Sequence, residues 1–125
     1  MKNTKYIPVI SRKENCKLAV SDICYVYRTN RKLNFETDLG VKSTYAKMDI
    51  IERCLGPEFC RCMSGCIVNM SRIKDMRDGI VFFDDGKIIK LGRDAFIKLK
   101  QRYQTYLYGL LSSDKTDDPD SDEDN

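Results

Sequence analysis

The segment 59–69, FCRCMSGCIVN, constrains the fold more than any other part of the chain. Its first half alternates, so that a strand would direct its odd-numbered side chains to one face and two cysteines to the other. Ser64 and Gly65 then interrupt the run, and glycine permits a positive φ or a close backbone approach. The segment therefore predicts two paired strands joined by a tip that presents Met63 and Ser64.

Short runs of the same kind recur along the chain. They are rich in β-branched and aromatic residues, and the Asp78-Gly79 and Asp85-Gly86 pairs between them are strong hairpin signals. Asn30 tolerates a positive φ and predicts the turn of another hairpin. We expect strands at residues 6–13, 17–20, 23–29, 33–37, 41–45, 59–62, 66–70, 73–77, 80–83 and 87–91.

Two segments have helical periodicity instead. A short apolar stripe ends at the Gly56-Pro57 stop signal and predicts one short helix, with Cys54 as a small core side chain. A longer stripe predicts a helix over residues 95–111. Asn69 is expected to shape the turn after its strand through its own side chain. The expected fold class is mainly β, with about ten short antiparallel strands, one short helix and a C-terminal helix.

The charge is divided unevenly along the chain. Residues 112–125 carry seven acidic residues and one lysine, which leaves 21 basic and 12 acidic residues in 1–111, a net charge of +9. The acidic segment has too few apolar residues to offset its ordering entropy, so we expect a disordered tail at 112–125 after a single domain at 1–111. A basic domain of this kind is typical of a phosphate-binding surface.

Several chemistries have no support in the residue types. No apolar run approaches the roughly 20 residues of a membrane span and no targeting signal is visible, so we expect a cytoplasmic protein with reduced cysteines. The chain has no histidine, and the one metal-like spacing, that of Cys60, Cys62 and Cys66, would need a fourth sulfur from a distant cysteine, Cys16, Cys24 or Cys54, to complete a zinc site. No catalytic motif is present. We therefore expect no enzyme activity, cofactor or metal.

The central segment resembles the LytTR family of bacterial DNA-binding domains, whose motif is roughly F-x-R-x-H-[RKN]-S-x-x-V-N followed by isoleucine. The matching residues here are Phe59, Arg61, Val68, Asn69 and Ile73. The resemblance extends over roughly residues 5–108. It includes an aspartate before the strand at 23–29 and a Leu-Gly-Arg sequence at 91–93. The chain departs from the motif at three positions, which are Met63, Ser64 and Gly65.

The resemblance implies a free-standing bacterial transcription regulator that contacts successive major grooves of double-stranded DNA through loops, with a second copy on adjacent sites. Within it, Arg31, Lys32 and Lys74 would neutralise phosphates. Arg93 has the geometry to contact guanine O6 and N7. Ser64 would contact a base or a phosphate, and Met63 offers only apolar contact, for example to a thymine methyl group.

Two alternatives stay open at this stage. The chain could be a protein-interaction module that keeps the fold without specific DNA binding, because the tip departs from the family motif. It could instead be a thiol-redox-responsive regulator, because Cys62 lies beside the tip. A regulatory protein partner and competition between the acidic tail and DNA for the basic surface also remain open.

Overall fold

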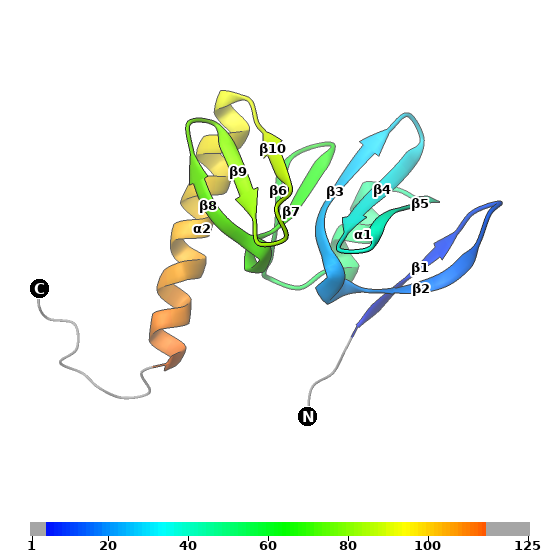
Figure 1. Ribbon diagram of the computed structural model, residues 1–125, viewed down its shortest axis with the longest axis horizontal. Helices are drawn as coiled ribbons and strands as arrows, with labels where there is room; N and C mark the ends of the chain where they lie inside the picture. Colours follow the sequence, from blue (N-terminus) through cyan, green and yellow to red (C-terminus); the bar gives the residue numbers. More distant parts are fainter. Residues whose placement is uncertain (1–4, 115–125) are drawn as a thin grey trace, which may run out of the picture.

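The computed structural model describes residues 5–114 and confirms the predicted fold class (Figure 1). Within residues 5–114, ten short strands form antiparallel pairs, with a short helix between the fifth and sixth strands and a long helix after the tenth. The elements are β1 (Tyr6–Ile10), β2 (Asn15–Ala19), η1 (Val20–Asp22), β3 (Ile23–Thr29), β4 (Lys32–Thr37), β5 (Gly40–Tyr45), α1 (Met48–Cys54), β6 (Phe59–Met63), β7 (Cys66–Asn69), η2 (Met70–Arg72), β8 (Ile73–Arg77), β9 (Ile80–Phe83), β10 (Ile88–Lys90) and α2 (Arg93–Asp114).

Some boundaries differ from the prediction. Strand β1 ends at Ile10 because the Ser11 hydroxyl accepts hydrogen bonds from the backbone N–H groups of Lys13 and Glu14, which turns the chain. Helix α2 continues to Asp114, so the first residues of the predicted tail are helical. The rest of the predicted disordered tail lies outside the described residues.

A five-stranded sheet in the order β5-β4-β3-β7-β6 forms the middle of the molecule. The β1–β2 hairpin and α1 contribute to a hydrophobic cluster on one face, and a three-stranded sheet, β10-β9-β8, packs with α2 on the other. Strand β3 contributes to both clusters, with Ile23 and Val26 in the first and Cys24 in the second, and a bulge lies between Ile23 and Tyr25.

The two clusters are built from alternate residues of the same strands. In β7, Ile67 belongs to the first cluster and Val68 to the second, and both are fully buried. The first cluster centres on Phe35 and the second on Phe83 and Leu99. Strand β7 is therefore buried on both faces, which explains its continuous apolar sequence.

Asn69 fixes the chain where it leaves the central sheet, as the sequence predicts. Its side chain is 1% exposed, and its Nδ2 donates to the Ile23 carbonyl over 2.8 Å. Its Oδ1 accepts from the Ser71 backbone N–H at 3.0 Å and from the Ser71 hydroxyl at 2.7 Å. The buried amide is thus satisfied, and it joins the start of β3 to η2.

Arg72, the last residue of η2, connects the central sheet to the three-stranded sheet. Its Nε donates to both carboxylate oxygens of Asp84 at 3.0 and 3.1 Å, its Nη2 to Asp38 at 2.6 Å, and its Nη1 to the Ser21 carbonyl at 3.1 Å. One planar guanidinium thereby joins three turns that are distant in the sequence.

We expect Asn69→Ala to lower the free energy of unfolding by about 1–3 kcal/mol, because the buried Ile23 carbonyl would lose its donor. Chemical denaturation monitored by circular dichroism measures the change. Gln101→Ala, on the exposed surface of α2, is the control and should stay within about 0.5 kcal/mol of the parent protein. Equal stabilities for the two variants would contradict this role of Asn69.

Candidate nucleic-acid interface

Three connections lie along one edge of the molecule, and we call residues 29–32, 63–66 and 91–93 the loop edge (Figure 1). Strand β3 runs antiparallel to both β4 and β7, and Tyr27 pairs with Cys66. The turn after β3 and the turn before β7 therefore lie at the same end of the sheet. The β10–α2 connection is joined to the β8–β9 turn, because the Leu91 N–H donates to the Gly79 carbonyl over 2.9 Å.

The β3–β4 turn carries the first two predicted DNA-contacting residues. Asn30 has a φ of 58°, as predicted, which allows a two-residue connection between the paired residues Thr29 and Lys32. Arg31 and Lys32 are exposed. Within residues 5–114, neither side chain forms an ion pair with a carboxylate, so both positive charges are available to an external anion.

The β6–β7 turn, which presents Met63 and Ser64, is fastened to its surroundings through its backbone. The Gly65 carbonyl accepts from the Arg28 N–H at 3.0 Å. The Ser64 carbonyl accepts from both Nε and Nη2 of Arg61, at 3.3 and 2.9 Å. Gly65 does not have a positive φ. Both predicted tip side chains are exposed.

The same guanidinium also joins the tip to α1. Arg61 Nη1 donates to Asp49 at 2.6 Å and to Glu52 at 2.9 Å, so one side chain holds two carboxylates and a backbone carbonyl. The hydrogen bond from Arg61 lowers the pKa of the Asp49 carboxyl, and the two carboxylates raise the pKa of Arg61. Arg61 is thus neutralised locally and positions the tip.

Arg93 begins α2 immediately after the β10–α2 connection. The Phe96 N–H donates to the Gly92 carbonyl at 2.9 Å, which starts the helix, and the Arg93 side chain is exposed. No carboxylate among the described residues lies within ion-pair distance of Arg93. A cation at a helix N-terminus opposes the macrodipole, so its position requires a reason other than helix stability.

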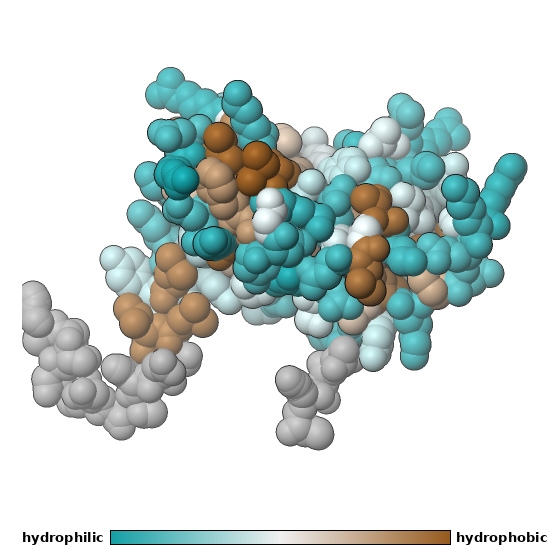
Figure 2. Space-filling view, in the orientation of Figure 1, coloured by the Kyte–Doolittle hydropathy of each residue, from teal (hydrophilic) through white to brown (hydrophobic). Residues whose placement is uncertain are grey.

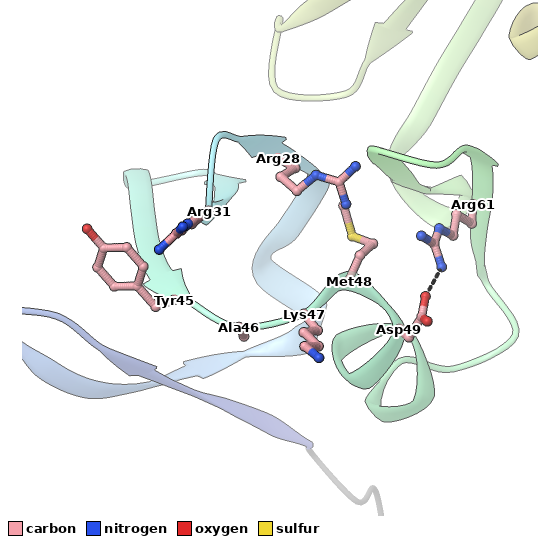
Figure 3. Close-up of a pocket in the computed structure, with 8 residues that line it drawn as sticks. All are labelled: Arg28, Arg31, Tyr45, Ala46, Lys47, Met48, Asp49 and Arg61. Atoms are coloured by element: carbon pink, nitrogen blue, oxygen red, sulfur yellow. Dashed lines mark hydrogen bonds and ion pairs between the residues drawn. The ribbon is translucent and has the colours of Figure 1, made fainter.

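Two hollows flank Arg61. The first has a volume of about 530 Å³ and lies between the β3–β4 turn and α1. Arg28 and Met48 line it, and Figure 3 shows the Arg61 guanidinium joined to Asp49. The second, of about 350 Å³, connects the tip to α2. The basic residues that line the two hollows are Arg28, Arg31, Lys47, Arg61, Lys98 and Arg102.

Sequence reasoning did not select four of these basic residues, which are Arg28, Lys47, Lys98 and Arg102. A usable signal existed for two of them, since Lys98 and Arg102 are four residues apart and share one face of the predicted helix. Arg28 and Lys47 carry no such local signal. They line the same hollow because the fold brings the end of β3 close to the start of α1.

Lys74 is the one predicted site residue that lies away from the loop edge. It is the second residue of β8, and it lines a separate hollow with Gly86 and Lys87 at the β9–β10 turn. That turn is at the end of the three-stranded sheet opposite to the β8–β9 turn and Arg93, because the strands are antiparallel. The structure thus brings together Arg31, Lys32, Met63, Ser64 and Arg93 but not Lys74.

The cysteines are mostly buried thiols. Four are buried and Cys16 is half-buried, whereas Cys54 is exposed, so its predicted place in the core is wrong. Cys54 is the last residue of α1, whose buried residues are Met48 and Ile51. Burial raises the pKa of Cys24 to about 12, and the neighbouring Cys62 together with burial raises the pKa of Cys66.

A cluster of Cys24, Asp38 and Asp85 has metal-like spacing but is already neutralised. Lys87 Nζ donates to Asp85 at 2.8 Å, and Asp85 accepts from the Cys24 thiol at 3.5 Å. Asp38 is bound to Arg72. Cations of the chain occupy both carboxylates, and burial raises the pKa of the Cys24 thiol. The geometry therefore fits a hydrogen-bonded contact between the two sheets better than a metal site.

Comparison with known proteins agrees with this geometry. The family model of the LytTr DNA-binding domain matches residues 13–104. A solved structure of a LytTr DNA-binding domain from Bacillus cereus has 17% sequence identity and a TM-score of 0.63, with 88% of this chain and 99% of that chain covered. No curated protein sequence matches the chain. The fold and the family match define a DNA-binding domain.

The chain belongs to the LytTR family. The loop edge is therefore the candidate nucleic-acid interface. Within residues 5–114, neither helix has the length and apolar character that crossing a membrane requires.

We expect Arg61→Lys to loosen the tip, because an ammonium cannot donate simultaneously to the Ser64 carbonyl and to both carboxylates of α1. Loss of about 1 kcal/mol of local hydrogen bonding should make the amide hydrogens of residues 63–66 exchange roughly fivefold faster. Hydrogen exchange measured by NMR gives the rates. Arg53→Lys, on the exposed last turn of α1, is the control, and unchanged exchange in Arg61→Lys would contradict the proposed support.

We expect a thiol reagent at pH 8 to modify Cys54 rapidly and the buried thiols only after unfolding. Burial raises the pKa of Cys24 to about 12 and shifts the pKa of Cys60 in the same direction, which disfavours both thiolates at pH 8. The hydrogen bond with Cys66 lowers the pKa of Cys62, so burial alone protects that thiol. Mass spectrometry of the labelled protein identifies the sites. Rapid modification of Cys62 in the folded protein would instead support the redox-responsive alternative.

Proposed function

We propose that this protein is a sequence-specific DNA-binding transcription regulator of the cytoplasm that places its loop edge in the major groove. The observation that carries the proposal is that the three connections of the loop edge, which carry Arg31, Lys32, Ser64 and Arg93, lie along one edge of the molecule (Figure 1). Among residues 5–114, the basic side chains of Arg31, Lys32 and Arg93 form no ion pair. Exposed cations without an internal ion pair can bind phosphates without first breaking an internal interaction.

The residues of the loop edge have different roles in this proposal. Arg31 and Lys32 neutralise phosphates and position the domain, whereas Arg93, at the other end of the edge, donates to guanine O6 and N7. Ser64 contacts a base or a phosphate, and Met63, 47% exposed, provides apolar contact. Lys98 and Arg102 continue the positive surface from the tip along α2.

The arrangement of the elements supports loop-mediated rather than helix-mediated recognition. The inner face of α2 is engaged with β6 and the second hydrophobic cluster, with Leu99 fully buried. Helix α1 is only seven residues long and is bound to Arg61. Neither helix is presented as a free recognition helix, so the turns between the strands are the parts of the molecule that can enter a groove.

Lys74 is left out of this interface, since it lies at the opposite end of β8 from the loop edge. Binding of a second copy to an adjacent site would give each copy its own groove, as is common for regulators with paired sites. The protein-interaction alternative predicts little salt dependence, and the DNA-binding proposal predicts a steep one.

We expect Arg93→Ala to weaken specific DNA binding by about 1–3 kcal/mol and to relax the preference at one base pair. We expect Lys32→Ala to weaken binding to all sequences and to reduce the salt slope by about one. Fluorescence anisotropy with the DNA upstream of its own gene and with single-base variants measures both effects. Identical behaviour of the two variants would contradict the division of roles.

Lys74→Ala serves as the matched control for Lys32→Ala, because both remove one exposed lysine. We expect it to leave affinity and salt slope close to those of the parent protein. A loss as large as that of Lys32→Ala would place the interface elsewhere on the surface. Binding that is indifferent to sequence and salt in the parent protein would overturn the proposed function itself.

A further inference from the structure

The first hollow combines unpaired cations with apolar side chains. Arg28, Arg31 and Lys47 line it, and among residues 5–114 none of these three side chains forms an ion pair. The carboxylate among its lining residues, Asp49, is held by Arg61 at 2.6 Å. Figure 2 shows hydrophilic side chains over the β3–β4 turn, which contributes Arg31. The hollow therefore carries three positive charges that no described residue neutralises.

The apolar side chains of the first hollow lie next to Lys47 in the sequence. Tyr45 ends β5, Ala46 follows it, and Met48 begins α1. Figure 3 shows these residues along the connection from β5 to α1. Tyr45 is 67% exposed, whereas Met48 is only 2% exposed and thus lies at the base of the hollow. The tyrosine offers a ring face on which a planar group can stack.

The form of the first hollow favours a small molecule over a duplex. Its volume of about 530 Å³ lies within the range of roughly 300–1,000 Å³ that is typical of ligand pockets. Such pockets combine apolar walls with a few polar groups that orient the ligand. A duplex presents its phosphates on a wide convex surface, so it reaches exposed cations such as Arg31 and leaves the recessed Met48 uncovered. A molecule smaller than a duplex can cover both.

We propose that the first hollow binds a small organic phosphate that carries a planar ring, of the chemical class of a nucleoside diphosphate. The phosphates match the charges of Arg28, Arg31 and Lys47, and a guanidinium binds phosphate oxygens through two parallel hydrogen bonds. The ring stacks on Tyr45 and covers the apolar base at Met48. Both parts of the ligand contribute, because inorganic pyrophosphate has no apolar surface and a nucleoside has no negative charge.

Occupancy of the first hollow opposes DNA binding, a consequence that rests on the proposed function. Arg31 lines the hollow and also belongs to the loop edge, so the ligand and a DNA phosphate compete for it. Arg28 adjoins the β6–β7 turn as well, since its N–H donates to the Gly65 carbonyl and a methyl group placed on Gly65 would lie 3.9 Å from its Nη2. The ligand and DNA therefore weaken the binding of each other by the same factor.

The test is a titration of the full-length protein with adenosine diphosphate in the absence of DNA, followed by amide chemical shifts in NMR. We expect saturable changes at residues 28–31 and 45–48, with a dissociation constant below about 1 mM. Inorganic pyrophosphate and adenosine should each bind at least about tenfold more weakly, because each lacks one half of the ligand. No saturable change up to about 10 mM, or pyrophosphate that binds as tightly as adenosine diphosphate, would overturn the proposal.

Single substitutions locate the site. Arg28→Gln and Lys47→Gln remove cations of the hollow that lie outside the loop edge, and each should raise the dissociation constant for adenosine diphosphate about three- to tenfold. Tyr45→Ala should raise it about fivefold and leave pyrophosphate binding unchanged. Lys74→Gln, at an exposed lysine away from the hollow, is the matched control and should have no effect. Equal effects of Lys47→Gln and Lys74→Gln would show general attraction to the basic surface and overturn the site.

Competition with DNA is measured separately, by fluorescence anisotropy of a labelled duplex. Adenosine diphosphate at ten times its dissociation constant should raise the apparent dissociation constant for DNA about tenfold at constant ionic strength. An unchanged DNA affinity with the ligand bound would overturn the competition. The ligand titration itself contains no DNA, so its result stands whether or not the protein binds a duplex, and failure of the DNA-binding proposal is distinguishable from failure of this one.

Discussion

The hydrogen bonds of Arg61 are the interaction on which the candidate interface depends. The Ser64 side chain in the turn between β6 and β7 is exposed, and Arg61 donates to the Ser64 carbonyl through both Nε and Nη2. The remaining donors bind Asp49 and Glu52, so the position of the tip is coupled to the position of α1. The carboxylates also cancel the charge of Arg61. An exposed cation such as Arg31 can therefore act on an external anion while Arg61 supports the backbone.

The packing around the central sheet also fixes the strand that leads from the β6–β7 turn. Both faces of β7 are buried, one against the cluster with α1 and one against the cluster with α2, so the strand that carries the tip is fixed from two sides. Asn69 and Arg72 then hold the opposite end of the same strand region through buried or bidentate hydrogen bonds. Turns on a sheet fixed at both ends keep their geometry, which is the requirement for placing side chains in a groove.

Local signals in the sequence were sufficient for the fold and for part of the site. Period-two alternation and X-D-G turns predict the strands, and Asp78 and Gly79 indeed have positive φ values of 54° and 77°. The family motif indicated Ser64 and Arg93, which the structure places on one edge. The second hollow beside Arg61 is lined by residues of β6 and α2. These elements are distant in the sequence, so no local sequence pattern predicts that they lie together. Lys74 was predicted to contact DNA because it is basic. The sequence does not show that the start of β8, where Lys74 lies, is at the opposite end of the sheet from the loop edge, because that depends on how the strands pair. The short stripe of α1 did not reveal that Cys54 falls outside the buried flank.

The central claim is that the loop edge contacts DNA. Mapping amide chemical shifts by NMR during titration with a short duplex from its own upstream region tests it most directly. The account predicts the largest changes at residues 29–32, 63–66 and 91–93, with weaker changes along Lys98 and Arg102 and none around the β9–β10 turn. Changes centred on the β9–β10 turn, or spread evenly over the basic surface, would contradict it.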